Sequence, residues 1–125
     1  MSANSDLLAG KVAIITGGSR GLGAAAAQLV VARGGSVVIA DLLEDEGKQL
    51  AGELGGAARF APLNVTDAEQ WKQVVDFTVA EFGTVTGLVN NAGISTGQFI
   101  EHEPVDHFRT VLEVNLVGVF NGMQA

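Results

Sequence analysis

The chain has 125 residues, 47% of them hydrophobic, which is enough to bury one core and excludes a disordered chain. Its formal net charge of −7 argues against nucleic acid as a partner, and the absence of cysteine excludes disulfides, zinc–thiolate sites and thiol nucleophiles. No apolar run reaches the roughly 18 residues that span a membrane, and residues 1–10 lack the basic and apolar regions of a secretory signal, so we expect a cytoplasmic protein without a membrane partner.

The first half of the chain alternates short apolar runs with helical periods. Residues 12–16 predict a strand, and apolar residues with helical spacing follow it until Gly34. Residues 37–40 predict a second strand, and a second helix then ends at Gly55. The apolar positions that define these helices are Leu22, Ala25, Ala26, Leu29 and Val30 in the first, and Leu43, Leu50, Ala51 and Leu54 in the second.

The second half of the chain continues this alternation. Residues 59–63 predict a third strand, after which Asp67 can cap a third helix that Gly83 stops. Residues 85–90 predict a fourth strand, and Pro104 opens a last helix. The apolar positions are Ala68, Trp71, Val74, Val75, Thr78, Val79 and Phe82 in the third helix, and Val105, Phe108, Leu112, Leu116, Val119 and Met123 in the last.

The order of the predicted elements is β-α-β-α-β-α-β-α. The strands are continuously apolar rather than alternating, as in a parallel sheet that helices cover on both faces. We therefore expect an α/β fold with a doubly wound, Rossmann-like parallel sheet, and one domain over residues 1–125. Such a sheet binds its ligand beyond the carboxyl ends of its strands, so function is expected in four loops. These loops are residues 17–23, 41–42, 64–66 and 91–97.

The loop after the first strand is rich in glycine and reads Thr16-Gly17-Gly18-Ser19-Arg20-Gly21-Leu22-Gly23. Glycines let a phosphate approach the backbone, and the helix that follows offers free N–H groups to a pyrophosphate. Asp41 ends the second strand, where a carboxylate accepts hydrogen bonds from an adenosine ribose. A tight turn also needs glycine, and Asp41 could instead cap the second helix. The ordered combination nevertheless favours a dinucleotide site, so residues 1–125 are expected to be the dinucleotide-binding part of the domain.

Two other kinds of site compete with this interpretation. The segment Gly17-Gly18-Ser19-Arg20-Gly21 also satisfies G-x-S-x-G, the nucleophile elbow of α/β hydrolases, which would make Ser19 a nucleophile. That mechanism needs a histidine downstream, but His102 and His107 lie outside any loop at the end of a strand. The same histidines stand in an acidic stretch that is typical of a solvated surface, so no metal site is expected.

Taken together, these motifs resemble the short-chain dehydrogenase/reductase family. They are Thr16-Gly17-x-x-x-Gly21-x-Gly23, then Asp41, then Asn90-Asn91-Ala92-Gly93, and then Asn115. The resemblance extends from about Lys11 to the end of the chain. Residues 40–42 and 88–97 are most similar to the bacterial 3α(or 20β)-hydroxysteroid dehydrogenases of that family, and acyl-carrier-protein reductases and secondary-alcohol dehydrogenases share these segments.

The resemblance implies a role for each matching residue. Arg20 and Leu22 would contact the cofactor largely through the backbone, and Asp41 would hold the adenosine ribose. Asn64 stands where the family usually has Asp. Its amide oxygen can still accept from the adenine amino group, so a weakened rather than a lost contact is expected, while the Val65 N–H pairs with the ring. The residues expected to bind the cofactor are Gly17, Ser19, Arg20, Gly21, Leu22, Gly23, Asp41, Leu42, Asn64, Val65, Asn91, Ala92 and Gly93.

Two asparagines are expected to act differently. Asn115 falls between Leu112 and Leu116 on the apolar positions of the last helix, where an amide costs stability unless it is hydrogen bonded. It could be a buried amide bonded to the sheet. The resemblance instead implies a catalytic residue, the Asn of an Asn-Ser-Tyr-Lys tetrad, which supports a helix distortion and a water that passes protons to the Lys. Asn90 is expected to tie neighbouring strands together.

The chain contains no tyrosine, so the general acid/base of this tetrad is missing. Its lysines, Lys11, Lys48 and Lys72, stand in no Tyr-x-x-x-Lys setting. We therefore expect a partial sequence, truncated after the helix that follows the fourth strand. The full-length enzyme would move a hydride between a secondary alcohol or ketone, a hydroxysteroid among the candidates, and nicotinamide. The alternatives are a non-catalytic dinucleotide-binding fragment and an enzyme resembling 3-oxoacyl-acyl-carrier-protein reductase.

The expected cofactor is NAD rather than NADP. The carboxylate of Asp41 would face and repel a 2′-phosphate. Arg20 is the counter-evidence, because a basic residue in the loop can pair with that phosphate, but Leu42 supplies no second positive charge. The expected partner is a small alcohol or ketone.

The resemblance also implies how the sheet is assembled. A strand order of 3-2-1-4, continued in the family by strands that this chain lacks, would leave the fourth strand of residues 1–125 as an open edge. It would also expose Leu116 and Val119, which the missing half or a partner subunit should cover. We therefore expect the full-length protein to be a homo-oligomer, a dimer or a tetramer. Ser95, Thr96 and Gln98 are expected near the nicotinamide and the entrance to the substrate site, because their loop leaves a strand end beside the glycine loop. The alternative is an ordinary polar surface loop.

Overall fold

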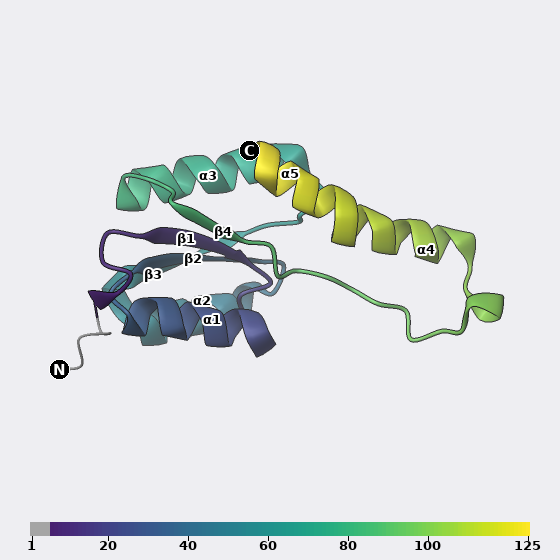
Figure 1. The fold of residues 1–125 in the computed structure, drawn as a ribbon, viewed down its shortest axis with the longest axis horizontal. Coiled ribbons are helices and arrows are strands. Elements are labelled where there is room, and N and C mark those ends of the chain that lie inside the picture. Colours follow the sequence, from purple (N-terminus) through teal and green to yellow (C-terminus); the bar gives the residue numbers. More distant parts are fainter. Residues whose placement is uncertain (1–5) are drawn as a thin grey trace.

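The structure of the chain, a computed structural model, describes residues 6–125 (Figure 1). Four parallel strands form one sheet in the order β3-β2-β1-β4. The strands are β1 (Val12–Thr16), β2 (Ser36–Asp41), β3 (Ala58–Pro62) and β4 (Gly87–Val89). This arrangement confirms the predicted doubly wound sheet and its order. The fourth strand is shorter than predicted, because only three of its residues pair with β1.

Helices cover both faces of the sheet, with α1 and α2 on one face and α3 and α5 on the other (Figure 1). The helices are α1 (Gly21–Ala32), α2 (Glu44–Leu54), α3 (Ala68–Phe82), α4 (Val105–Leu112) and α5 (Gly118–Gln124). Two 3-10 turns, η2 (Gly55–Ala57) and η3 (Ile100–His102), and a π-helical segment, η4 (Glu113–Val117), complete the elements. Within residues 6–125, none of these helices has both the length and the apolar character needed to traverse a bilayer.

The sheet separates two clusters of buried apolar residues. Ile15 and Val37 point toward α1 and α2, where they join one cluster. Their neighbours Ile14 and Val38 point to the opposite face and pack with Trp71 of α3. Successive strand residues face opposite sides, so covering both faces requires apolar residues at every position. This explains why the strands read as continuous apolar runs.

Several helix boundaries lie where the sequence predicts them. The Asp67 carboxylate accepts hydrogen bonds from the N–H groups of Glu69 and Gln70, at 3.0 and 3.2 Å, and so caps α3. Gly83 ends that helix in the left-handed conformation, with φ of 85°. Pro104 immediately precedes α4. Local signals therefore fix these ends.

The face that α1 turns to the sheet differs from the predicted one. Leu22 and Leu29 were expected in the core, but their side chains are 84% and 54% exposed, whereas Gly23 and Ala27 are buried. A Cβ on Gly23 would lie only 2.2 Å from the carbonyl oxygen of Gly17. The helix therefore packs on its smallest residues, because this close approach of two backbones determines which side faces inward.

The last helix shows the same preference for small residues at its contact. Gly118 and Gly122 are buried against Val65 and Trp71, respectively. The predicted apolar positions point outward instead: Leu116 is 64% exposed, as expected, and Phe108, Leu112 and Met123 are also exposed. Val119, expected to be exposed, is half-buried. The helix is also not uniform, because the π-helical segment separates α4 from α5.

Candidate functional site

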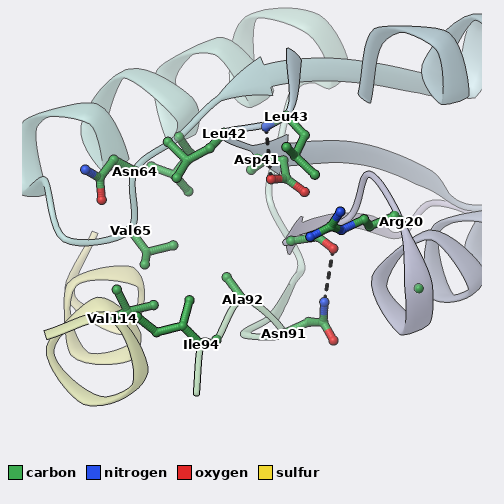
Figure 2. Close-up of a pocket in the computed structure, with 15 residues that line it drawn as sticks. Arg20, Asp41, Leu42, Leu43, Asn64, Val65, Asn91, Ala92, Ile94 and Val114 are labelled. Atoms are coloured by element: carbon green, nitrogen blue, oxygen red, sulfur yellow. Dashed lines mark hydrogen bonds between the residues drawn. The ribbon is translucent and has the colours of Figure 1, made fainter. Parts of the chain in front are cut away.

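The carboxyl ends of the strands meet around an open cavity of about 440 Å³ (Figure 2). All four loops in which function was expected contribute to its walls. The lining residues are Gly17, Arg20, Gly21, Ala40, Asp41, Leu42, Leu43, Leu63, Asn64, Val65, Asn91, Ala92, Gly93, Ile94 and Val114. Ten of them belong to the predicted cofactor-binding set. The cavity thus lies where the sequence motifs predict a dinucleotide.

Three residues of the predicted set do not line the cavity, namely Ser19, Leu22 and Gly23. Ser19 is buried, and its hydroxyl donates to the carbonyl oxygen of Leu43 at 3.3 Å. The Leu22 side chain points into solvent, and Gly23 lies against Gly17. None of these three positions therefore contributes a side chain to the cavity wall, and Ser19 and Gly23 instead hold the shape of the loop.

The start of α1 presents unpaired backbone donors. Within residues 6–125, the N–H groups of Gly21, Leu22 and Gly23 form no hydrogen bond, and the first helical bond runs from Ala24 to Arg20 at 3.2 Å. Gly21 has φ of 60°, which lets the chain turn from the loop into the helix without strain. Free amides and the positive end of the helix dipole together favour a bound anion such as a phosphate.

The nucleophile-elbow alternative does not fit this geometry. Ser19 is only 7% exposed and already donates its hydroxyl hydrogen to a carbonyl oxygen. His107 lies in α4, where Nδ1 is 3.4 Å from Oε1 of Glu103 rather than beside Ser19. A serine nucleophile needs a basic group within hydrogen-bonding reach, so the described residues hold no hydrolase site at Ser19. Over the same residues, no three acidic or histidine side chains gather as metal ligands.

Thr16 and Asn91 join the glycine loop to the segment after β4. The Thr16 hydroxyl accepts hydrogen bonds from the N–H groups of Asn91 and Ala92, at 3.0 and 2.9 Å. The Asn91 amide donates to the carbonyl oxygens of Thr16 and Gly17, both at 3.1 Å. Figure 2 shows the bond to Gly17. We expected Asn90 to tie the strands, but within residues 6–125 its side chain forms no hydrogen bond, and the side chains of Thr16 and Asn91 make the links instead. Thr16 belongs to the sequence motif but was assigned no role, because nothing in the sequence indicates that its hydroxyl bonds to a segment 75 positions away.

Asp41 is held in place by two backbone amides. Its Oδ2 accepts from the N–H of Ser19 and its Oδ1 from the N–H of Leu43, each at 3.1 Å. The alternative role as the N-cap of α2 is not observed, because Leu43 occupies that position. A carboxylate offers about four acceptor sites, so roughly two remain for a ligand in the cavity. Asp41 can therefore bind hydroxyl groups while it braces the glycine loop.

Asn64 uses its side-chain oxygen within the protein. Oδ1 accepts from both the N–H and the hydroxyl of Thr66, at 3.0 and 2.7 Å. This differs from the expectation that the same oxygen accepts from an adenine amino group. The neighbouring Val65 is fixed by its carbonyl oxygen, which accepts from Trp71 Nε1 at 3.0 Å and from Asn121 Nδ2 at 3.1 Å. The α5 helix thereby holds the wall of the cavity.

Asn115 lies in the π-helical segment and binds the loop after β4. Its Oδ1 accepts from the N–H of Ile94 at 2.9 Å, and its Nδ2 donates to the carbonyl oxygen of Ile94 at 2.8 Å. The helix distortion expected at Asn115 is present, but the residue is exposed rather than buried against the sheet. Ile94 and Val114 thus come to line the cavity; the sequence analysis missed both, because their place depends on this link.

Comparisons with known proteins agree with this architecture. Residues 11–125 match the short chain dehydrogenase family, and the chain belongs to that family. It is 47% identical to trans-4-hydroxycyclohexanecarboxylate dehydrogenase of Sinomonas cyclohexanicum, over the whole chain and 52% of that protein. It is 46% identical to 3-alpha-(or 20-beta)-hydroxysteroid dehydrogenase of Mycobacterium tuberculosis, over 97% of the chain and 46% of that protein. The chain therefore spans about half the length of these relatives.

A third relative bears on the cofactor. The NADP-dependent (R)-specific alcohol dehydrogenase of Lentilactobacillus kefiri is 42% identical over 94% of the chain and 48% of that protein. The relatives of this chain thus include one whose name specifies NADP.

Solved structures show the same fold. A short-chain dehydrogenase of Novosphingobium aromaticivorans superposes with a TM-score of 0.88 at 35% identity, over 93% of this chain and 44% of that one. A family member from Brucella melitensis superposes with a TM-score of 0.90 at 24% identity, over 94% of this chain and 51% of that one.

Proposed function

We propose that the full-length protein is an NAD-dependent oxidoreductase and that residues 1–125 hold its cofactor. The observation that carries this proposal is one cavity with the free amides of α1 on one side and the carboxylate of Asp41 on the other. A nicotinamide dinucleotide, when bound, accepts or donates the hydride that interconverts an alcohol and a ketone. The chain's own residues bind and orient it.

The residues around the cavity fit the parts of such a cofactor. The N–H groups of Gly21 and Leu22 would bind the pyrophosphate. The remaining acceptor sites of Asp41 would bind the ribose hydroxyls. Gly17 has φ of 63°, and a Cβ there would lie 3.0 Å from Asn91 Nδ2, so glycine lets the loop turn and pack against Asn91 at the cavity wall. Asn91 and its neighbours would line the path toward the nicotinamide.

The structure gives a physical reason to favour NAD over NADP. Two backbone amides hold the Asp41 carboxylate, so it cannot turn away from a 2′-phosphate without losing both hydrogen bonds. Arg20 also lines the cavity and supplies one positive charge. We expect the carboxylate to dominate and NAD to bind tighter by about 1–3 kcal/mol, from charge repulsion and lost hydrogen bonds.

The names of several relatives suggest the substrate class. They refer to a hydroxycyclohexane carboxylate, a hydroxysteroid and a chlorinated cyclohexadiene diol. All three carry a hydroxyl on or beside an alicyclic ring. We therefore propose a cyclic secondary alcohol, a hydroxysteroid included, as the substrate of the full-length protein.

We also propose a setting for the full-length protein. The exposed apolar residues of α4 and α5 favour a homo-oligomer, because isolated apolar patches of this kind are usually covered. The lack of cysteine is in keeping with the cytoplasm.

The proposal is tested on the full-length protein with purified cofactors. Isothermal titration calorimetry should give a lower dissociation constant for NAD than for NADP. NADH formation at 340 nm should be faster with cyclohexanol derivatives and 3α-hydroxysteroids than with open-chain 2-alkanols. Tighter binding of NADP would contradict the cofactor assignment, and the absence of turnover with every alcohol would contradict the enzyme assignment.

The variant Asp41→Ala separates the contribution of the carboxylate. It should weaken NAD binding at least tenfold and bring the two cofactors closer in affinity. Gln73→Glu, on the exposed side of α3, changes the charge of the protein away from the cavity and should leave both dissociation constants unchanged.

A further inference from the structure

Asn64 and Val65 form one end of the cavity (Figure 2). The apolar side chains of Leu42 and Val114 line the same end. A pocket with apolar walls and a few polar groups at one rim can bind a flat heteroaromatic ring, because the polar groups form hydrogen bonds with the edge of the ring. If the cofactor binds as proposed, this is where its purine base lies.

The orientation of the Asn64 amide follows from its neighbour Thr66. The N–H of Thr66 can only donate, so the atom 3.0 Å from it must be the amide oxygen. The Thr66 hydroxyl donates to the same oxygen at 2.7 Å. An amide oxygen has two lone pairs, and these two bonds occupy both. The polar atom that Asn64 has left for a ligand is therefore Nδ2, which is a donor.

The adjacent backbone group is also a donor. Over residues 6–125 the N–H of Val65 forms no hydrogen bond, and neither does Asn64 Nδ2. Trp71 and Asn121 bind the carbonyl oxygen of Val65 and so restrain this residue. The rim of the cavity thus offers two donors and no acceptor from these residues.

We propose that Asn64 is a specificity-determining residue and that it makes the purine subsite nearly indifferent to a 6-amino or a 6-oxo group; this inference rests on the proposed function. Adenine presents a donor at its 6-position and an acceptor at N1. Hypoxanthine presents an acceptor at its 6-position and a donor at N1. Each base therefore places an acceptor against one of the two donors at the rim and a donor against the other.

An aspartate at position 64 would reverse this balance. Its carboxylate would still accept from the N–H and hydroxyl of Thr66 and would keep free acceptor sites for a ligand. Adenine would then satisfy both groups, the carboxylate with its amino group and the Val65 N–H with N1. Hypoxanthine would oppose both. A site built to bond a polar group discriminates strongly against a base that leaves it unpaired.

The test compares two dinucleotides that differ only at the purine. Isothermal titration calorimetry on the full-length protein measures dissociation constants for NAD and for nicotinamide hypoxanthine dinucleotide. In the wild type the two should agree within threefold. In Asn64→Asp the ratio should shift at least tenfold toward NAD. Gln73→Glu, the same amide-to-acid change on the exposed side of α3, should leave the ratio unchanged.

Asn64→Ala provides a second variant that does not depend on a new charge. It removes the donor that serves the 6-oxo group, so its ratio should shift severalfold toward NAD. A wild type that prefers NAD by tenfold or more, or an Asn64→Asp ratio that shifts less than tenfold, overturns the inference. If wild type binds neither dinucleotide, the proposed function fails and this inference fails with it.

Discussion

Thr16 and Asn91 stand 75 positions apart in the chain, yet their hydrogen bonds organise the site. Motifs at the ends of the strands could be recognised from the sequence, because glycine, aspartate and asparagine recur there at a characteristic spacing. The hydrogen-bond partner of each side chain could not be predicted from the sequence. Asn91 rather than Asn90 binds the glycine loop, and Asn64 accepts from Thr66 through its amide oxygen. Each of these bonds depends on the position of backbone groups in the folded chain.

Gly23 provides a test of backbone contact at the level of one residue. In Gly23→Ala the new methyl group would meet the Gly17 carbonyl at 2.2 Å and Asn91 Nδ2 at 2.6 Å. We expect this variant to lose about 3 kcal/mol of stability, at the upper end for an overpacked site. Urea unfolding of the full-length protein measures the loss.

The matched control is Gly52→Ala, also within a helix. Gly52 is exposed, and a Cβ there would meet nothing within 4 Å. This variant should gain about 0.5–1 kcal/mol, because alanine has less conformational freedom to lose. Equal effects of the two substitutions would show that the Gly17–Gly23 contact does not limit stability.

At the scale of elements, the apolar pattern predicts where the strands and helices lie. It does not always predict which face of a helix points toward the sheet. The pattern succeeded for α3, where Trp71 and Val74 are buried, because large side chains fill the space over the sheet there. It was wrong for α1 and for the last helix, where glycines allow a closer approach than leucine does. Periodicity measures hydrophobicity and contains no term for the distance between backbones.

The link between η4 and the loop after β4 should control the mobility of that loop. Asn115 makes two hydrogen bonds to the backbone of Ile94. In Asn115→Ala the Ile94 N–H loses its acceptor, so its hydrogen exchange should speed up at least tenfold. Glu113→Ala, an exposed neighbour in the same segment, should leave this rate unchanged. Unaltered exchange in Asn115→Ala would show that the loop is held by other contacts.

The loop that follows Ile94 should serve the substrate more than the cofactor. Within it, the Thr96 hydroxyl accepts from the N–H of Gln98 at 3.1 Å, and neither residue lines the cavity. We expect Thr96→Ala and Gln98→Ala to raise KM for the alcohol severalfold and to change the dissociation constant of NAD less than twofold. Steady-state kinetics and calorimetry on the full-length protein decide this, and the opposite pattern would place the loop at the cofactor.

At the scale of the whole molecule, the described sheet ends at β4, which pairs only with β1. Beyond it, α4 extends past the sheet (Figure 1), and most of the large apolar residues of α4 and α5 are exposed. A strand edge with unpaired N–H and C=O groups and a row of exposed apolar side chains both promote association with another chain. The strand order predicts this open edge, and Leu116 is exposed as expected, whereas Val119 is half-buried.

A polypeptide of residues 1–125, made alone, should therefore self-associate and show no dehydrogenase activity. Phe108, Leu116 and Met123 are between 52% and 68% exposed, and the sequence contains no tyrosine to act as the family's general acid/base. Size-exclusion chromatography with light scattering should show species larger than the 12.8 kDa monomer. Replacing Leu116 and Met123 by Gln should shift the distribution toward monomer, whereas Lys72→Gln on the exposed side of α3 should not. A stable monomer that oxidises cyclic alcohols with NAD would overturn both the expected association and the assigned chemistry.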